Sequence, residues 1–155
     1  MIKNRRSFIV GLKSTILQVK EIQFLKKYKP WGVILFSRNI KSIVQTKKLT
    51  DDIRRIFNDK KYPILIDQEG GRVNRLNNLI DSSNFTGEFF GNLYKKNIKK
   101  FNVFYKIFIN QTCCLLNQIG ININTVPVLD LRYNKSNNII GNRSFGSSPK
   151  IVSRI

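Results

Sequence analysis

Four short, continuous apolar runs restrict the folds open to this 155-residue chain more than any other feature of its sequence. They lie at 8–12, 32–36, 63–66 and 121–126, and each has the length of a β-strand. Because the runs do not alternate with polar residues, both faces of each strand should be buried, as is typical of parallel sheets. Amphipathic segments separate them. The sequence therefore predicts an α/β fold with a parallel sheet.

Helices are expected between these strands because apolar side chains recur there at helical spacing. The expected ranges are 15–28, about 42–56 and about 94–118, with a long polar loop at 67–92 and a further helix start at 148–149. Ser42 should cap the second helix, and Gly120 should end the third. In the third helix we expect the lysines on the solvated side, and on the buried side Ile98, Phe101, Tyr105, Phe108 and Leu115.

The chain has no histidine, and its two cysteines, Cys113 and Cys114, are adjacent. Zinc sites with histidine ligands, Ser-His-Asp triads and Cys-His dyads therefore cannot be built from this sequence. The adjacent cysteines fit neither a CxxC metal knuckle nor a disulfide framework, so we expect reduced thiols in the core. No apolar stretch has the length of a signal-peptide core or a membrane span, and we expect a cytoplasmic protein without a membrane partner.

Lys and Arg outnumber Asp and Glu by 28 to 9, which gives a formal net charge of +19. Such an excess raises nucleic acid or an anionic surface as a partner. However, Lys, Asn, Ile and Phe are all abundant and have A/T-rich codons, so a composition bias explains much of the charge. The lysines also spread over several predicted helices, and no RNP motif, helix-turn-helix signal or glycine-rich phosphate loop is found. A basic nucleic-acid-binding protein stays an alternative, and no specific nucleic-acid partner is expected.

Polar residues follow the predicted strands at their carboxyl ends, where parallel α/β enzymes place their ligands, at 37–39, at 67–69 and at Asp130. The densest group is the run Asp-Gln-Glu-Gly-Gly-Arg-Val-Asn-Arg at 67–75. A carboxylate accepts hydrogen bonds from hydroxyls and an arginine donates in a fixed fork, so this run suits a sugar or an anion. The alternative is a salt-bridged turn in which Arg72 or Arg75 neutralises Asp67 or Glu69.

Four motifs in this order resemble the N-terminal half of a glycoside hydrolase family 3 barrel. They are GVILFSRN at 32–39, DQEGGRVNR at 67–75, NTVPVLD at 124–130 and GNRSF at 141–145. The likeness covers essentially the whole chain and is greatest to the bacterial β-N-acetylhexosaminidases of peptidoglycan recycling. It implies that residues 1–155 belong to a single TIM (β/α)₈ barrel domain, here an incomplete barrel of about four strand-helix units. It also implies hydrolysis of terminal β-linked N-acetylglucosamine from cell-wall fragments with retention, and no metal or organic cofactor.

The resemblance implies a role for each matched residue. Asp67 and Arg75 match family positions that hold hydroxyls of the non-reducing sugar, and Arg143 matches an arginine that lines the same subsite. The matched residues expected to shape the site are Arg38, Asn39, Glu69, Gly70, Gly71 and Asp130.

The catalytic groups of the resembled enzymes have no match in this sequence. Retaining glycosidases need a nucleophile and an acid/base group. In the resembled enzymes the acid/base is a His-Asp pair after a K-H-x-P-G-H-G segment, and the nucleophile is a later aspartate. Nothing in the sequence supports Glu69 and Asp130 as replacements. We therefore predict no catalytic residue in this chain, which leaves three possibilities open: a truncated enzyme, a sugar-binding module without turnover, and a half-barrel that a second chain completes.

Overall fold

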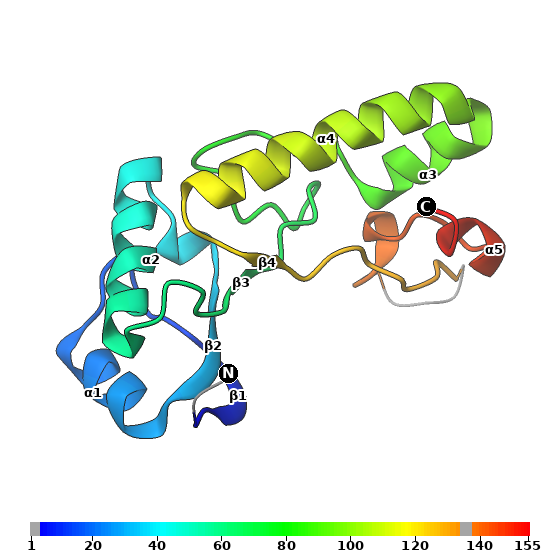
Figure 1. Ribbon diagram of the computed structural model, residues 1–155. Coiled ribbons are helices and arrows are strands. Elements are labelled where there is room, and N and C mark those ends of the chain that lie inside the picture. The colour runs from blue at the N-terminus through cyan, green and yellow to red at the C-terminus, as the bar shows by residue number, and fades with distance from the viewer. Residues whose placement is uncertain (1–3, 134–137) are drawn as a thin grey trace. The chain divides into compact units, whose positions relative to one another are not determined.

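The computed structural model describes residues 4–133 and 138–155, and Figure 1 labels their helices and strands. The chain divides into two compact units, and each has its own apolar core. The first unit comprises Met1–Asp67, Arg75–Ile80 and Cys114–Thr125, and the second comprises Gln68–Asn74, Asp81–Cys113 and Val126–Ile155.

A four-stranded parallel sheet forms the centre of the first unit, with the strands in the order β1-β2-β3-β4. The strands are β1 (Arg6–Gly11), β2 (Pro30–Leu35), β3 (Ile64–Ile66) and β4 (Ile123–Asn124). The register pairs Val33 of β2 with Val10 and with Ile64, and Leu65 of β3 with Ile123. The predicted α/β class and parallel sheet are confirmed.

Burial differs between the inner strands and the edge strands of this sheet. The three residues of β3 are all buried, and β2 is buried or half-buried throughout. The expectation of burial on both faces is wrong for β1, where Ile9 is 44% exposed. In the described structure β1 is an edge strand paired only with β2, which leaves its other side uncovered. The fourth strand is also shorter than the predicted run at 121–126.

Helices α1 (Val19–Tyr28) and α2 (Ile43–Phe57) belong to the first unit (Figure 1). The hydroxyl of Ser42 accepts a hydrogen bond from the amide of Gln45 at 3.2 Å, which confirms the predicted cap of α2. Helix α1 begins four residues later than the predicted range. The carboxylate of Glu21 accepts from the amide of Gln18 at 2.9 Å and so fixes this start.

The core of the first unit lies between the sheet and these helices. Its buried members are Leu12, Leu25, Val33, Leu35, Ile40, Leu49, Ile53, Tyr62, Ile64, Ile66, Leu76, Leu116, Ile119 and Ile121. Asn58 ends α2 with a φ of 47°, and Gly120 follows α4 with a φ of 78°. The predicted stop at Gly120 is confirmed.

The second unit contains two helices where the sequence predicts a loop and then one helix. These are α3 (Gly87–Lys96) and α4 (Ile98–Gln118), whose last turn enters the first unit. The hydroxyl of Thr86 accepts from the amide of Phe89 at 3.0 Å, so a capping residue inside the expected loop starts α3. The extended backbone of Asn97 separates the helices. The short helices η2 (Gly141–Arg143) and α5 (Pro149–Val152) follow, and α5 confirms the helix start predicted at 148–149.

Helix α4 buries a narrow side through an aromatic cluster with α3. Phe101 is buried and Tyr105 and Phe108 are half-buried, while the lysines of α4 are exposed as predicted. Two expectations for this helix are wrong, because Ile98 is 51% exposed and both cysteines are exposed, free thiols. The buried side follows positions 101, 105, 108, 112 and 115, and Ile98, Cys113 and Cys114 lie outside that series.

Within 4–133 and 138–155, no helix has the combination of length and apolarity that crossing a bilayer requires.

Candidate functional site

Polar side chains gather at the carboxyl edge of the sheet in the first unit. Asp67 directly follows β3, and Thr125 directly follows β4. The hydroxyl of Thr125 donates a hydrogen bond to Asp67 Oδ1, and Arg75 Nη2 lies 3.8 Å from Asp67 Oδ2. The side chains of Asp67 and Arg75 are 31% and 29% exposed, so both remain accessible to a ligand.

The separation between Asp67 and Arg75 decides what this pair can bind. At 3.8 Å the two groups attract each other as charges, but this distance is too long for a direct hydrogen bond. A hydroxyl placed beside them can donate to the carboxylate and accept from the guanidinium at the same time. The pair thus has the chemistry of a polyol site, and it is also the ion pair between Arg75 and Asp67 that the alternative of a salt-bridged turn predicted.

An aromatic ring and a second arginine lie beside this pair. The guanidinium carbon of Arg75 lies 5.4 Å from the centre of the Phe36 ring, and that of Arg38 lies 4.6 Å from it. Arg38 Nε also donates to the carbonyl of Leu12, which follows β1, at 2.8 Å. Arg38 is therefore held to the backbone beyond β1, and both arginines lie within cation–π distance of one ring.

Asn39 is completely buried at the end of the short helix η1 (Ser37–Asn39). Its Nδ2 donates to the carbonyls of Leu12 and Ser14 at 3.1 and 2.8 Å, and its Oδ1 accepts from the amide of Phe36 at 2.9 Å. These bonds join the loops that follow β1 and β2. The geometry fits the site-shaping role expected for Asn39, which stays a prediction.

The second unit contains a different arginine–carboxylate pair. Arg143 donates from Nε and Nη2 to the two carboxylate oxygens of Glu69, at 2.8 and 2.7 Å. The Glu69 side chain is 11% exposed, so this bidentate pair is largely shielded from water. Glu69 thereby fixes the orientation of the Arg143 guanidinium.

The two glycines that follow Glu69 occupy backbone positions where a side chain would clash. Gly70 has a φ of 91°, and a Cβ there would lie 2.4 Å from the carbonyl oxygen of Phe85. Gly71 has a φ of 58°, and its Cβ would lie 2.6 Å from the Thr86 side chain. Both positions require glycine because positive φ and close packing coincide.

Two residues from the sequence motifs lie elsewhere than expected. Asp130 is exposed and lies six residues beyond the end of β4, so its expected position at a strand end is wrong. The chain leaves the sheet after Thr125, and the Asp130 carbonyl accepts from the Ser144 hydroxyl at 2.7 Å. Arg72 neutralises neither Asp67 nor Glu69, because its Nη2 donates to backbone carbonyls, including that of Ile140 at 2.9 Å.

The predicted substrate-binding residues fall into both units. Asp67 and Arg75 are together in the first unit, with Arg38 and Asn39 at the same sheet edge. Arg143 belongs to the second unit, as do Glu69, Gly70, Gly71 and Asp130. The prediction that Arg143 shares a subsite with Asp67 stays a prediction.

The sequence analysis did not identify Thr125 and Phe36 as neighbours of Asp67 and Arg75 at the sheet edge. Each directly follows a strand, Thr125 after β4 and Phe36 after β2, and position at a strand end is the signal that could have identified both. Within the described ranges, no group of three or more His, Cys, Asp or Glu residues could hold a metal ion.

Comparison with known proteins identifies the class. The glycosyl hydrolase family 3 N-terminal domain model matches residues 14–155, and the chain belongs to this family. The resemblance found in the sequence motifs is confirmed.

The similar proteins are hexosaminidases. A β-hexosaminidase of Hydrogenovibrio crunogenus is 35% identical over 148 residues, which are 95% of this chain and 40% of that protein. β-Hexosaminidase A of Pseudoalteromonas piscicida is 32% identical over 146 residues, which are 91% of this chain and 24% of that protein. The crystal structure of NagZ from Neisseria gonorrhoeae in complex with N-trifluoroacetyl-D-glucosamine is similar with a TM-score of 0.86 and 29% identity, over 97% of this chain and 44% of that one. The chain thus spans less than half the length of each of these relatives.

Proposed function

We propose that this chain is the N-terminal part of a retaining β-N-acetylhexosaminidase barrel and that it binds terminal β-linked N-acetylglucosamine of cell-wall fragments. The observation that carries the proposal is the half-exposed ion pair of Asp67 and Arg75, 3.8 Å apart at the carboxyl edge of the sheet, with Thr125 bonded to Asp67. The similarity to hexosaminidases, one of them in complex with an N-acetylglucosamine analogue, supplies the class of sugar.

In this proposal the binding residues have separate tasks. Asp67 accepts hydrogen bonds from sugar hydroxyls, Arg75 donates to them, and Thr125 orients the Asp67 carboxylate. Arg143, whose guanidinium Glu69 orients, is the further sugar donor that the family resemblance implies. The nucleophile and the acid/base group come from chain that these residues do not include, so the isolated chain binds sugar without cleaving it.

The unpaired edges of the sheet favour a partner that completes the barrel. In the described structure β1 and β4 each pair with one neighbour, which leaves one unpaired edge on each. We propose that both units belong to one domain and that further strands, from the same or a second chain, pair with these edges. The free, exposed thiols of Cys113 and Cys114 suit a reducing compartment, and we place the protein in the cytoplasm.

The charge distribution gives little support for specific nucleic-acid binding. Lys47 and Lys48 of α2 form ion pairs with Asp51 and Asp52, and other lysines lie on exposed surfaces of helices in both units. We therefore propose that DNA affinity is weak and falls steeply with salt, as expected for unspecific phosphate contacts.

The test is a titration of the 155-residue chain with N-acetylglucosamine, followed by NMR of backbone amides. We expect saturable shifts at the edge formed by Asp67 and Thr125, and loss of binding by roughly tenfold or more in Asp67→Asn, because a charged acceptor is replaced. Asp81→Asn, a change at an exposed carboxylate in a loop, is the matched control and should bind like the unmodified chain. Equal affinity of the Asp67 and Asp81 variants would contradict the proposed site.

Catalysis is tested separately with a chromogenic β-N-acetylglucosaminide. The isolated chain should show no hydrolysis above background, and activity should appear only when the C-terminal remainder of a family 3 barrel is supplied. Turnover by the pure chain would show that the catalytic groups lie within it.

A further inference from the structure

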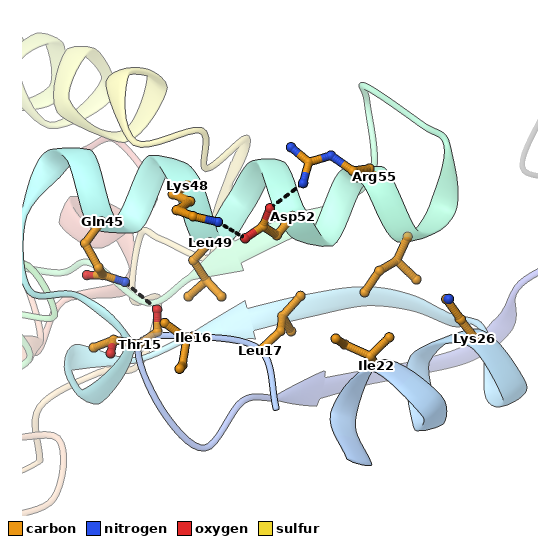
Figure 2. A pocket seen from close by; sticks show the side chains of 11 residues that line it. Thr15, Ile16, Leu17, Ile22, Lys26, Gln45, Lys48, Leu49, Asp52 and Arg55 are labelled. Atoms are coloured by element: carbon orange, nitrogen blue, oxygen red, sulfur yellow. Dashed lines mark hydrogen bonds and ion pairs between the residues drawn. The ribbon is translucent and has the colours of Figure 1, made fainter. Parts of the chain in front are cut away.

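A cavity of about 760 Å³ lies between α1 and α2 in the first unit, apart from the carboxylate–arginine cluster at the sheet edge (Figure 2). Its apolar lining comes from the segment before α1 and from both helices, and consists of Ile16, Leu17, Ile22, Leu49 and Ile56. Leu49 belongs to the core, and Leu17 and Ile56 pack against it, so the floor of the cavity is the outer face of the core. This volume is typical of small-molecule sites.

The charged side chains of the cavity are arranged unevenly along its length. Figure 2 shows Lys26 at one end and Thr15, Ile16 and Gln45 at the other, with Arg55 on the Lys26 side of Asp52 and its guanidinium turned toward that carboxylate. Lys26 lies in the last turn of α1, and Arg55 in the last turn of α2. Because parallel βα units place the carboxyl ends of their helices on the same side, the fold itself brings these two cations to one end.

The lining of the cavity carries more positive charge than its single carboxylate can balance. Asp52 accepts from Lys48 Nζ at 2.8 Å and from Arg55 Nη1 at 2.7 Å, so one carboxylate serves two cations. No carboxylate of the described residues lies within ion-pair distance of Lys26. The lining thus holds three cations and one carboxylate above an apolar floor.

We propose that this cavity binds an unbranched fatty acid, with the carboxylate at Lys26 and Arg55 and the alkyl chain along Leu17 and Leu49 toward Ile16. The apolar floor favours an alkyl chain, and the excess charge at one end favours an anionic headgroup. Ile16 is 66% exposed, so a chain that reaches it would cover apolar surface that water now contacts. The site is independent of the proposed saccharide site, and either can fail without the other.

The alkyl contribution is tested with ligands of increasing chain length. Each methylene that enters the cavity should tighten binding by about fourfold, so decanoate, with two more methylenes, should bind roughly fifteenfold more tightly than octanoate. Isothermal titration calorimetry of the 155-residue chain, below the concentration at which the ligands form micelles, measures this difference. Methyl NMR shifts should be concentrated at Leu17 and Leu49.

The charge contribution is tested with decanol and with two matched variants of α1. Lys26→Gln should weaken decanoate by about threefold to fivefold and leave decanol unchanged, because only the carboxylate uses the cation. Lys20→Gln removes an exposed lysine of the same helix that does not line the cavity, and it should change neither ligand. Ile22→Gln, which makes the apolar lining polar, should weaken both.

Three results would overturn the proposal. The first is no saturable binding of decanoate, and the second is equal affinity for decanoate and decanol in the unmodified chain. The third is an equal effect of Lys20→Gln and Lys26→Gln, which would reveal general attraction to a basic surface. Because Lys26 is exposed and α1 does not need its charge to fold, this variant stays informative if Ile22→Gln fails to fold.

Discussion

Replacement of Gly91 by alanine tests how α3 holds the segment that carries Arg143. Within the second unit, α3 presents Gly87 and Gly91, one turn apart, to the backbone of residues 143–145. A Cβ at Gly91 would lie 1.8 Å from the carbonyl oxygen of Phe145, and a Cβ at Gly87 would lie 2.1 Å from that of Arg143. The missing side chains allow the helix to pack directly against this backbone.

Two opposing effects set the change in the free energy of unfolding that Gly91→Ala causes. In the interior of an isolated helix, alanine is favoured over glycine by about 1 kcal/mol. Against this, the clash must separate α3 from residues 143–145 by more than about 1 Å and loosen a core that contains Phe90 and Phe145, and such overpacking costs about 3 kcal/mol. We therefore expect a net loss of about 2 kcal/mol in the free energy of unfolding, opposite in sign to helix propensity.

Urea denaturation followed by circular dichroism measures this loss, with Asn92→Ala as the control. Asn92 is exposed on the same helix, so its replacement should stabilise the chain by a few tenths of a kcal/mol. Chemical shifts of the Arg143 side chain should move in Gly91→Ala and not in Asn92→Ala. A stability gain of about 1 kcal/mol in Gly91→Ala would refute the close approach of α3 to residues 143–145.

Further predictions concern the Glu69 pair, Asn39 and Tyr62. Glu69→Gln should destabilise the chain by about 2 kcal/mol in urea denaturation, because it leaves the Arg143 guanidinium without its carboxylate in a largely shielded position. Asn39→Ala should cost about 3 kcal/mol in the same assay, since it removes the hydrogen bonds of the buried amide to the Ser14 carbonyl and to the Phe36 amide. Tyr62→Phe should cost about 1–2 kcal/mol, because the buried phenol donates to the carbonyl of Pro30 at 2.9 Å. Burial also raises the pKa of Tyr62 above its usual value, so the stability that its neutral form contributes is intact below about pH 10 and is lost as the pH rises further. Urea midpoints measured from pH 8 to 11 should therefore fall less steeply in Tyr62→Phe than in the unmodified chain.

The sheet was predictable because burial decides the residue types of inner strands. The continuous apolar runs of β2 and β3 reflect positions covered on both faces, and a run without polar alternation can be recognised in the sequence alone. Strand β1 has a similar run but an exposed edge, and the sequence does not reveal which strand lies at the edge. Pairing partners are set by tertiary structure, so exposure of Ile9 could not be derived.

The division between α3 and α4 was harder to predict because it rests on capping. The apolar spacing continues across Asn97, and the helices are marked by the hydroxyl of Thr86 and by Asn97, whose backbone is extended and whose Oδ1 accepts from the amide of Lys100 at 2.9 Å. The aromatic series of α4 was predicted correctly from Phe101 onward. Cys113 and Cys114 were assigned to the core because they lie in an apolar helical stretch and fit neither a metal knuckle nor a disulfide framework, but helix phase places them outside the packed side.

The two arginine–carboxylate pairs show why the site itself needed coordinates. The run at 67–75 contains two carboxylates and two arginines, and the sequence alone allows several pairings, including a turn closed upon itself. In the structure Glu69 binds Arg143, 74 residues away, while Arg72 binds backbone carbonyls. Because of these contacts, neither Glu69 nor Arg72 forms an ion pair within the run. Asp67 pairs with Arg75, at 3.8 Å. Because Arg143 binds both oxygens of Glu69, Asp67 is the carboxylate of the run that stays at the sheet edge, and its ion pair with Arg75 still leaves oxygen lone pairs that can accept from a sugar hydroxyl.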